Sequence, residues 1–166
     1  MNSATHSPVH TTTYDRSACS VGILHLGFGA FHRAHQAVYI DDYMQVSGDL
    51  RWGIAAVNLR GSETAHFDIA DADITRNDGY YLKSYSADGD VALRLVRSHI
   101  HFADWSADKA KTEALLSEPS VHLVTITVTE SGYYTDPNGN LNAADPTMKA
   151  EIAGGTPQSV YGYLRA

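Results

Sequence analysis

A pair of glycines between an apolar run and a helical pattern is the part of this 166-residue chain that most clearly suggests chemistry. The apolar run is Val21 to Leu26, and Gly27 and Gly29 follow it. In nucleotide-binding proteins, this layout brings the pyrophosphate of a dinucleotide against the first turn of a helix. His32 replaces the third glycine of the usual Gly-x-Gly-x-x-Gly pattern, which predicts a wider turn or a modified variant of the fold.

An acidic side chain beyond the second strand would bind the ribose hydroxyls in the adenosine half of such a cofactor. The first candidate is Glu63, which comes several residues after that strand should end. Glu63 could equally be an acidic residue in the first turn of the next helix, where the helix dipole stabilises it. Arg60 could accommodate the 2′-phosphate of NADP, so these residues leave both NAD and NADP open.

Glu130 is a further titratable residue in a position suited to chemistry. It comes at the carboxyl end of a predicted central strand, where open α/β sheets bind their ligands. Capping of the turn before Gly132 is an equally good role for it. The chain lacks the Gly-x-Ser-x-Gly pattern of many hydrolases and the Tyr-x-x-x-Lys pair of short-chain dehydrogenases, which excludes the simplest versions of both functions.

Two pairs of histidines raise the question of a metal site. His32 and His35 are three residues apart on a predicted helix, but no carboxylate or third ligand at suitable spacing accompanies them. His99 and His101 share one face of a predicted strand, and we expect them to be solvent-facing or hydrogen-bonded. No metal site is predicted, and the single cysteine, Cys19, cannot by itself form a zinc site or a disulfide.

The elements that must position these residues begin with a βαβ unit. Apolar positions spaced by three and four residues predict a helix from Phe31 to Val46. Trp52 to Leu59 is a nearly continuous apolar run, as expected of a parallel strand that is covered on both faces. A short helix near Glu63 to Ala70 is expected after this second strand.

The rest of the chain adds a hairpin and further elements of an α/β fold. Tyr80 to Ser86 and Val91 to Ile100 are rich in strand-forming residues, and the Asp-Gly pair between them favours an antiparallel hairpin on the parallel sheet. We also expect a helix over 106–116, a central strand over 121–129 and a helix that starts at 156–159. The predicted architecture is a Rossmann-like, mostly parallel doubly wound sheet, incomplete, with an inserted antiparallel hairpin.

Composition limits the class of protein. With 43% hydrophobic and 19% charged residues, the chain has enough apolar content for one compact domain, and we expect a dinucleotide-binding domain over 21–166. The segment 1–20 is rich in Ser, Thr and His, and we expect it to be a flexible arm. The net charge of −7 argues against nucleic-acid or anionic-membrane partners, because both need a basic surface. The lone cysteine and a polar N-terminal segment without an apolar core predict a cytoplasmic protein with no signal peptide or anchor.

Several stretches resemble the mannitol dehydrogenase family of long-chain polyol and hexuronate dehydrogenases. The first is Gly27-Phe28-Gly29-Ala30-Phe31-His32-Arg33-Ala34-His35-Gln36-Ala37, in which His32 fits that family's Gly-x-Gly-x-Phe-x-Arg-Ala-His fingerprint. The others are Trp52-Gly53-Ile54, Leu59-Arg60 and Thr125-Ile126-Thr127-Val128-Thr129-Glu130-Ser131-Gly132-Tyr133. The similarity runs from about Tyr14 to the C-terminus.

The resemblance implies a metal-independent, NAD(P)-dependent oxidoreductase that interconverts a sugar alcohol or aldonate with the corresponding ketose or ketouronate. The residues it implies at the pyrophosphate are Gly27, Phe28, Gly29, Ala30, Phe31 and Arg33. It implies that Glu63 stands where the family has an aspartate for the ribose, with Arg60 nearby. Thr129 would lie near the nicotinamide end of the cofactor, and Glu130 on a proton path to solvent.

Members of that family are several hundred residues long, and their catalytic lysine, asparagine and histidine lie beyond the matching region. The lysines here are Lys83, Lys109, Lys111 and Lys149, and none matches the catalytic one. We therefore expect a parent protein that transfers hydride and a chain that is inactive by itself. The alternative is a non-catalytic nucleotide-binding or interaction module that has lost its substrate domain and self-associates through exposed apolar surface.

Overall fold

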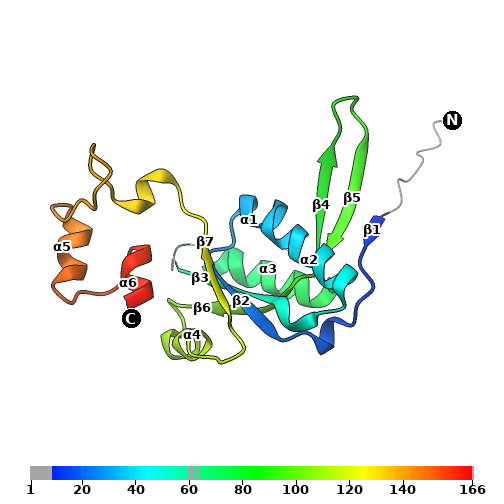
Figure 1. Cartoon of the computed structure of the whole chain (residues 1–166), viewed down its shortest axis with the longest axis horizontal. Helices are drawn as coiled ribbons and strands as arrows, with labels where there is room; N and C mark the ends of the chain where they lie inside the picture. Colours follow the sequence, from blue (N-terminus) through cyan, green and yellow to red (C-terminus); the bar gives the residue numbers. More distant parts are fainter. Residues whose placement is uncertain (1–8, 60–61, 63, 166) are drawn as a thin grey trace. The chain divides into compact units, whose positions relative to one another are not determined.

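The computed structural model describes residues 9–59, 62 and 64–165 (Figure 1). The chain forms two compact units, 1–125 and 126–166, where length and composition predict a single domain. The first unit contains the glycine turn. Among the residues whose positions are described, no helix combines the length and apolar character needed to cross a bilayer.

A four-stranded parallel sheet lies at the centre of the fold. Its strand order is β6-β3-β2-β7, with β2 at Val21–Leu26, β3 at Gly53–Asn58, β6 at His99–Asp104 and β7 at Leu123–Ile126. The strands predicted over 21–26 and 52–59 are confirmed as β2 and β3. Every residue of β3 is buried, as expected for a strand covered on both faces.

The other two strands of this sheet differ from the sequence prediction. The run over 121–129 forms only the short β7, which lies at the edge of the described sheet and not at its centre. The run over 91–100 divides, because β5 (Val91–Val96) joins the hairpin whereas β6 joins the parallel sheet. Between them, the buried Ser98 hydroxyl donates to the carbonyl oxygen of Ala37 at 2.7 Å and holds the chain where it passes between the two sheets.

Two helices replace the single one predicted from Phe31 to Val46. Helix α1 covers Ala30–Ala34, and α2 covers Gln36–Ser47. They are separated at His35, whose φ of −122° and ψ of −83° lie outside the helical region. Gly48 ends α2 with a left-handed φ of 69°.

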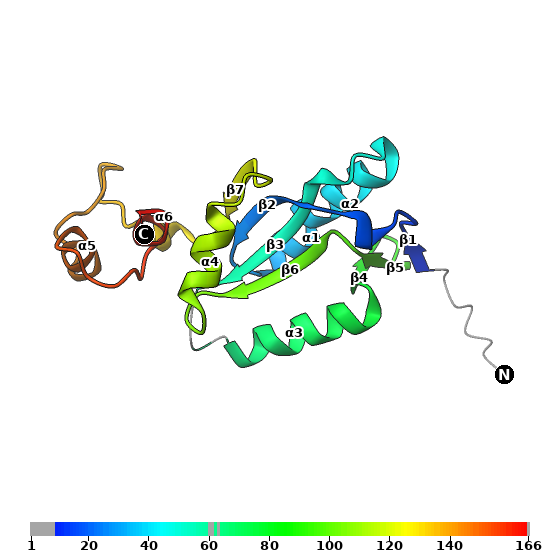
Figure 2. The ribbon, with the colours of Figure 1, turned by 90° about the horizontal axis from the view of Figure 1, so that it is seen from below.

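Helices cover both faces of the parallel sheet. On one face, Ala37 of α2 packs against Ile54, and α3 (Thr64–Asn77) packs against Ala56. Helix α4 (Lys109–Leu116) lies across the opposite face, in front of the strands in Figure 2. The helices expected near 63–70 and over 106–116 are confirmed, the first longer and the second shorter than predicted. The arrangement confirms the Rossmann-like α/β class.

Strand β2 and the turn before β3 approach each other closely at Gly22. A Cβ atom at this position would lie 2.0 Å from the carbonyl oxygen of Arg51 and 3.1 Å from the Cα atom of Trp52. Both are backbone atoms, so no side-chain rotation could relieve the overlap. The fold therefore requires glycine at this position.

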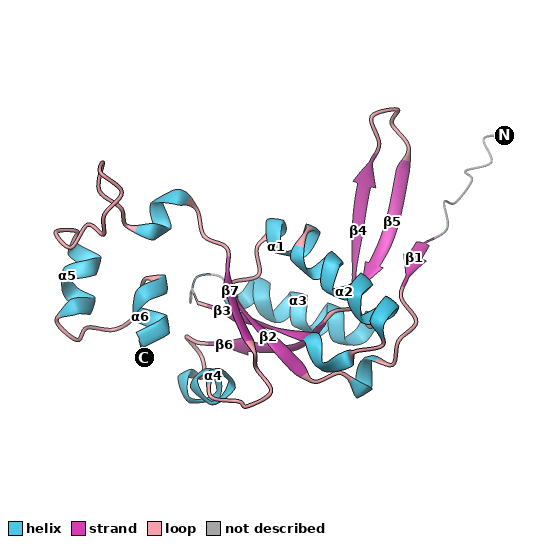
Figure 3. Ribbon diagram, viewed as in Figure 1, coloured by secondary structure: helices cyan, strands magenta, loops and turns pink. Residues whose placement is uncertain are grey.

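The predicted hairpin is confirmed, but it forms a sheet of its own. Strand β4 (Tyr80–Tyr85) pairs antiparallel with β5, and β5 pairs in parallel with β1 (Val9–Thr11), as Figure 3 shows. Strand β1 belongs to the segment 1–20, for which the sequence predicts a flexible arm. Val9–Thr11 of this segment are instead paired with the hairpin as a strand.

A buried carboxylate, Asp41 of α2, connects the N-terminal segment and the hairpin to the helix. The hydroxyls of Thr12 and Tyr14 donate to Asp41 Oδ1 at 3.0 and 2.7 Å. Arg94 of β5 donates from Nη2 to Asp41 Oδ2 at 2.8 Å. Burial raises the pKa of Tyr14, and the hydrogen bond to Asp41 raises it further. One charged group therefore holds three separate segments together.

The second unit contains two short helices, α5 (Pro146–Ile152) and α6 (Val160–Arg165). The sequence prediction lacks α5, although Asp145 before a proline is a helix-start signal. The Asp145 carboxylate accepts from the N–H of Thr147 at 2.8 Å. Helix α6 begins just after the start predicted at 156–159.

Candidate functional site

The turn between β2 and α1 has the backbone geometry that the glycine pair predicts. Gly27 has a φ of +112°, which residues with a side chain rarely adopt, and its N–H donates to the carbonyl oxygen of Val57 at 2.8 Å. Gly29 is the N-cap of α1, and a Cβ atom there would meet no heavy atom of the described residues within 4 Å. Open space therefore lies beside the backbone N–H groups at the start of α1, which have no acceptor within the helix.

The other residues predicted at this turn divide between core and surface. The Phe28 ring packs edge-on against two core phenylalanines at 6.0 and 5.5 Å, so the ring serves the core. Ala30 and Phe31 are exposed. The guanidinium of Arg33 lies 5.1 Å from the centre of the Phe28 ring, and its Nε atom is buried without a hydrogen-bond partner among the described residues.

Asn58 and Asp104 end β3 and β6 at the carboxyl edge of the sheet, and the sequence reasoning missed both. Asn58 Nδ2 and Thr64 Oγ1 donate to Asp104 Oδ2 at 2.8 and 2.7 Å. Burial opposes the ionisation of Asp104, but hydrogen bonds from Ser106, Asn58 and Thr64 outweigh it and lower the pKa of the carboxyl group. The carboxylate thus fixes the end of β3 and the start of α3. The Asp-x-Ser spacing at 104–106, typical of an Asx turn, was the available signal.

The residues predicted at the two ends of the cofactor are placed differently. Arg60 and Glu63, predicted at the ribose, lie outside the described residues. Thr129 and Glu130 belong to the second unit, where both are exposed. Thr129 precedes a 3₁₀ turn, η4 (Glu130–Tyr133), and its hydroxyl oxygen lies 3.1 Å from that of Ser131.

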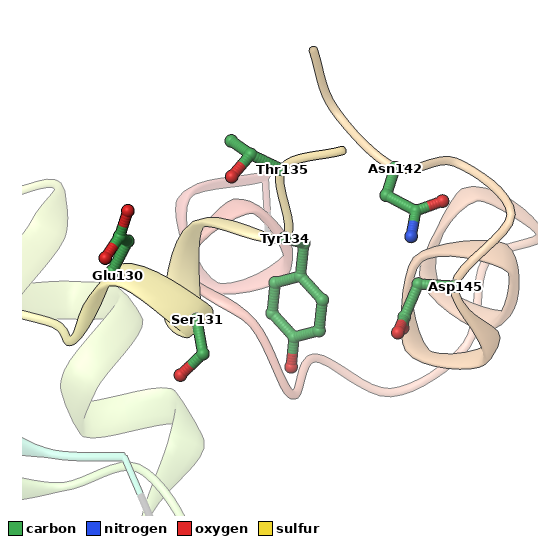
Figure 4. Close-up of a pocket in the computed structure, with 6 residues that line it drawn as sticks. All are labelled: Glu130, Ser131, Tyr134, Thr135, Asn142 and Asp145. Atoms are coloured by element: carbon green, nitrogen blue, oxygen red, sulfur yellow. The ribbon is translucent and has the colours of Figure 1, made fainter. Parts of the chain in front are cut away.

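Glu130 lines a pocket of about 460 Å³ within the second unit (Figure 4). The lining residues are Glu130, Ser131, Tyr134, Thr135, Asn142 and Asp145. Their hydroxyl, amide and carboxylate groups can hydrogen-bond a polyhydroxylated compound. Tyr134 has a left-handed φ of 47°, so the wall of the pocket includes a sparsely populated backbone conformation. The Gly132 N–H donates to the carbonyl oxygen of Thr129 at 2.8 Å and closes the turn before Gly132.

Three buried histidines form a cluster next to the glycine turn. His25 of β2, His32 of α1 and His99 of β6 are each at most 1% exposed. The His25 and His32 rings stack at 3.4 Å with an interplanar angle of 8°, and the Nε2 atoms of His32 and His99 are 2.9 Å apart. His99 is therefore hydrogen-bonded, one of its two predicted states. In place of the third glycine, His32 puts an imidazole ring between α1 and β2.

Burial keeps these rings neutral. It lowers the pKa of His25 to about 3, with a further contribution from His32, and lowers the pKa of His32 to about 4. It also holds the pKa of His99 well below its ordinary value. In the described part of the chain, no three His, Cys, Asp or Glu side chains are grouped as metal ligands. Neutral imidazoles can each donate and accept one hydrogen bond.

Comparison with known proteins identifies the family. Residues 21–165 match the family model of the mannitol dehydrogenase Rossmann domain. The chain belongs to the mannitol dehydrogenase family. The match includes the glycine turn, the histidine cluster and most of the second unit of this mannitol dehydrogenase domain.

Two curated relatives and one solved structure are similar to the chain along most of its length. Mannitol 2-dehydrogenase of Pyricularia oryzae is 31% identical and matches 98% of the chain, and D-arabinitol 4-dehydrogenase of Ralstonia nicotianae is 34% identical and matches 87%. The Pseudomonas fluorescens mannitol 2-dehydrogenase ternary complex with NAD and D-mannitol matches 94% of the chain at 29% identity, with a TM-score of 0.79. The chain spans 32%, 30% and 32% of these three proteins, about a third of their length.

Proposed function

We propose that this mannitol dehydrogenase domain binds NAD at the turn of Gly27 and Gly29. The observation that carries the proposal is the φ of +112° at Gly27, in a turn that joins a parallel strand to a helix and has open space beside Gly29. NAD is bound in the related ternary complex. The Arg33 Nε atom, buried and unpaired among the described residues, supports an anionic ligand here, because an unsatisfied buried donor is unfavourable.

Different residues of the chain would bind the different parts of NAD. The backbone N–H groups at the start of α1, together with Arg33, hold the pyrophosphate. The carboxylate of Asp104 fixes the two ends of the segment that contains Arg60 and Glu63, the residues proposed for the ribose. Thr129 is proposed for the nicotinamide end. These assignments favour NAD and keep NADP as the alternative cofactor.

For the full-length parent, we propose a dehydrogenase that interconverts a polyol or aldonate with a ketose or ketouronate. NAD, when bound, supplies the acceptor for hydride. In this chain, Glu130 is proposed to carry protons between the reaction and solvent, and the polar pocket that it lines supports that role. The net charge of −7 and the lone cysteine support a cytoplasmic setting without nucleic-acid or membrane partners.

Calorimetric titration of the chain with NAD tests the proposal. We expect binding by the wild type and at least about tenfold weaker binding by Gly27→Ala, because a side chain disfavours the φ that the turn requires. Gly89→Ala is the matched control: Gly89 also has a positive φ (86°), and a Cβ atom there would meet no described residue, but it lies at the hairpin tip. Folded wild-type chain that binds neither NAD, NADP nor ADP-ribose would overturn the proposal.

The alternative function is a nucleotide-binding or interaction module without catalysis. The exposed side chains of Leu123 and Val124 on β7, which are 45% and 41% exposed, favour a further contact at this edge of the described sheet. Turnover assays with NAD and a panel of polyols accompany the titration. Robust turnover by the chain alone would contradict both the alternative and the expected inactivity.

A further inference from the structure

The hydrogen bonds of the histidine cluster determine which ring nitrogens carry protons. Gln36 Oε1 lies 3.0 Å from His32 Nδ1 and also accepts from the Thr125 hydroxyl at 3.2 Å. An amide oxygen can only accept, so His32 Nδ1 must carry a hydrogen. The Thr125 proton is used on Gln36, so the Thr125 oxygen accepts from His25 Nδ1 at 2.8 Å. Both His25 and His32 are therefore protonated on Nδ1.

The same reasoning assigns the proton of His99. A neutral His32 with its proton on Nδ1 presents a lone pair at Nε2. His99 Nε2, 2.9 Å away, must therefore donate to it. His99 Nδ1 is then unprotonated, and it is buried without a hydrogen-bond partner among the described residues. A one-way chain of hydrogen bonds runs from β6 through His32 of α1 to Gln36 at the start of α2.

The charged groups that face the cluster favour neutral rings. After burial, the lowering of the pKa of His99 comes from the other two rings and from Arg33 and Arg16. Arg16 donates from Nη2 to the His99 carbonyl oxygen at 2.5 Å. The Tyr80 ring lies 5.6 Å from that of His99, and its hydroxyl donates to the Arg33 carbonyl oxygen. Among the described residues, no carboxylate hydrogen-bonds to any of the three rings.

We propose that His32 is a positioning residue for the cofactor turn: its stacked ring sets the spacing between α1 and β2, and its two hydrogen bonds set the orientation of α1. The proposal rests on the proposed NAD binding, because its consequence is the placement of the N–H groups that follow Gly29. In a conventional fingerprint, a glycine at this place allows close contact between helix and strand. Here the 3.4 Å ring stack with His25 takes the place of that contact.

Nitrogen-15 NMR of the histidine side chains tests the proton arrangement without a ligand. At pH 7, long-range ¹H–¹⁵N spectra of the full chain should show His25 and His32 protonated on Nδ1 and His99 protonated on Nε2. Spectra of single histidine-to-glutamine variants assign the signals. A His32 that is protonated on Nε2, or that is charged at pH 7, would overturn the proposal.

Titration with NAD tests the consequence for the turn. His32→Leu removes both hydrogen bonds but keeps apolar bulk, and we expect about tenfold weaker NAD binding. His122→Leu is the control, because it replaces an exposed histidine of the same unit and should bind NAD like the wild type. Wild-type affinity in His32→Leu would contradict the positioning role.

A second variant keeps the test decisive if His32→Leu does not fold. His99→Phe keeps a ring in the core but removes the hydrogen bond to His32 Nε2, so NAD binding should still weaken severalfold, and unchanged affinity would contradict the proposal. Failure of the wild type to bind NAD would instead overturn the proposed function. In that case the NMR spectra still confirm or overturn the proton arrangement.

Discussion

Acidification from pH 7 to pH 5 is expected to lower the free energy of unfolding of the first unit by several kcal/mol. The folded His25 and His32, with pKa values of about 3 and about 4, remain neutral at pH 5, whereas the unfolded side chains, with a pKa of about 6.5, bind protons. Each of these histidines therefore contributes a loss of about 2 kcal/mol over this interval. Their stabilisation is complete above about pH 6.5 and is lost as the pH falls towards the folded pKa values.

Urea unfolding, followed by tryptophan fluorescence at pH 7, 6 and 5, measures this loss. Asp104, whose pKa is lowered, titrates below the interval and does not contribute. His32→Gln cannot ionise, so its stability should fall by about 2 kcal/mol less than that of the wild type. Equal free energies of unfolding at pH 7 and pH 5 would show that the cluster is not a buried, neutral one.

Replacement of Asp41 by alanine is expected to destabilise the protein by about 3 to 5 kcal/mol. The Asp41 side chain is 0% exposed, and its loss deprives Arg94, Thr12 and Tyr14 of their common acceptor. The main source of the loss is that the buried hydroxyl groups lose their acceptor, while Arg94 keeps only the half-exposed Asp42 as an ion-pair partner among the described residues. The N-terminal segment should also be held less firmly to α2, because it loses the bonds of Thr12 and Tyr14 and keeps the bond of the Thr13 N–H to Gln45 Oε1.

The neighbouring residue provides the control for this prediction. Asp42 also accepts from Arg94, at 2.7 Å, but its side chain is 47% exposed. Asp42→Ala should therefore lower the free energy of unfolding by less than about 1 kcal/mol. Urea unfolding of both variants, together with limited trypsin digestion at Arg16, measures stability and release of the segment. Similar losses for the two variants would contradict the role assigned to burial.

The local sequence pattern was enough to predict the elements in which successive residues have the same kind of surroundings. Strands β2 and β3 are apolar runs that are buried along nearly their whole length, and an Asp-Gly pair joins the two strands of the hairpin. The sequence also indicated the turn at Gly27, because positive φ and glycine are linked by sterics alone. Such features depend on a few neighbouring residues, so a single sequence contains them.

The features that were mispredicted depend on residues far apart in the chain. The strand predicted over 91–100 divides because Ser98 hydrogen-bonds to Ala37, sixty-one positions away. The sequence pattern could not show that His32 is buried, because its ring partners His99 and His25 come from β6 and β2, the strands on either side of β3. The break at His35 leaves the spacing of apolar residues unchanged, so periodicity could not reveal it. Asp104 gains its importance from Asn58 and Thr64, which belong to other elements.

Glycine is required at Gly22 and at Gly27 for two different reasons. Any side chain there would meet the backbone carbonyl oxygen of Arg51 at 2.0 Å, so the requirement for glycine arises from folding and not from a ligand. Gly27, five residues later, is required for the shape of the turn at which we propose that NAD binds. A descendant that lost its cofactor could therefore drift at position 27 but not at position 22. The two glycines together would distinguish a relative that has lost binding from one that has lost the fold.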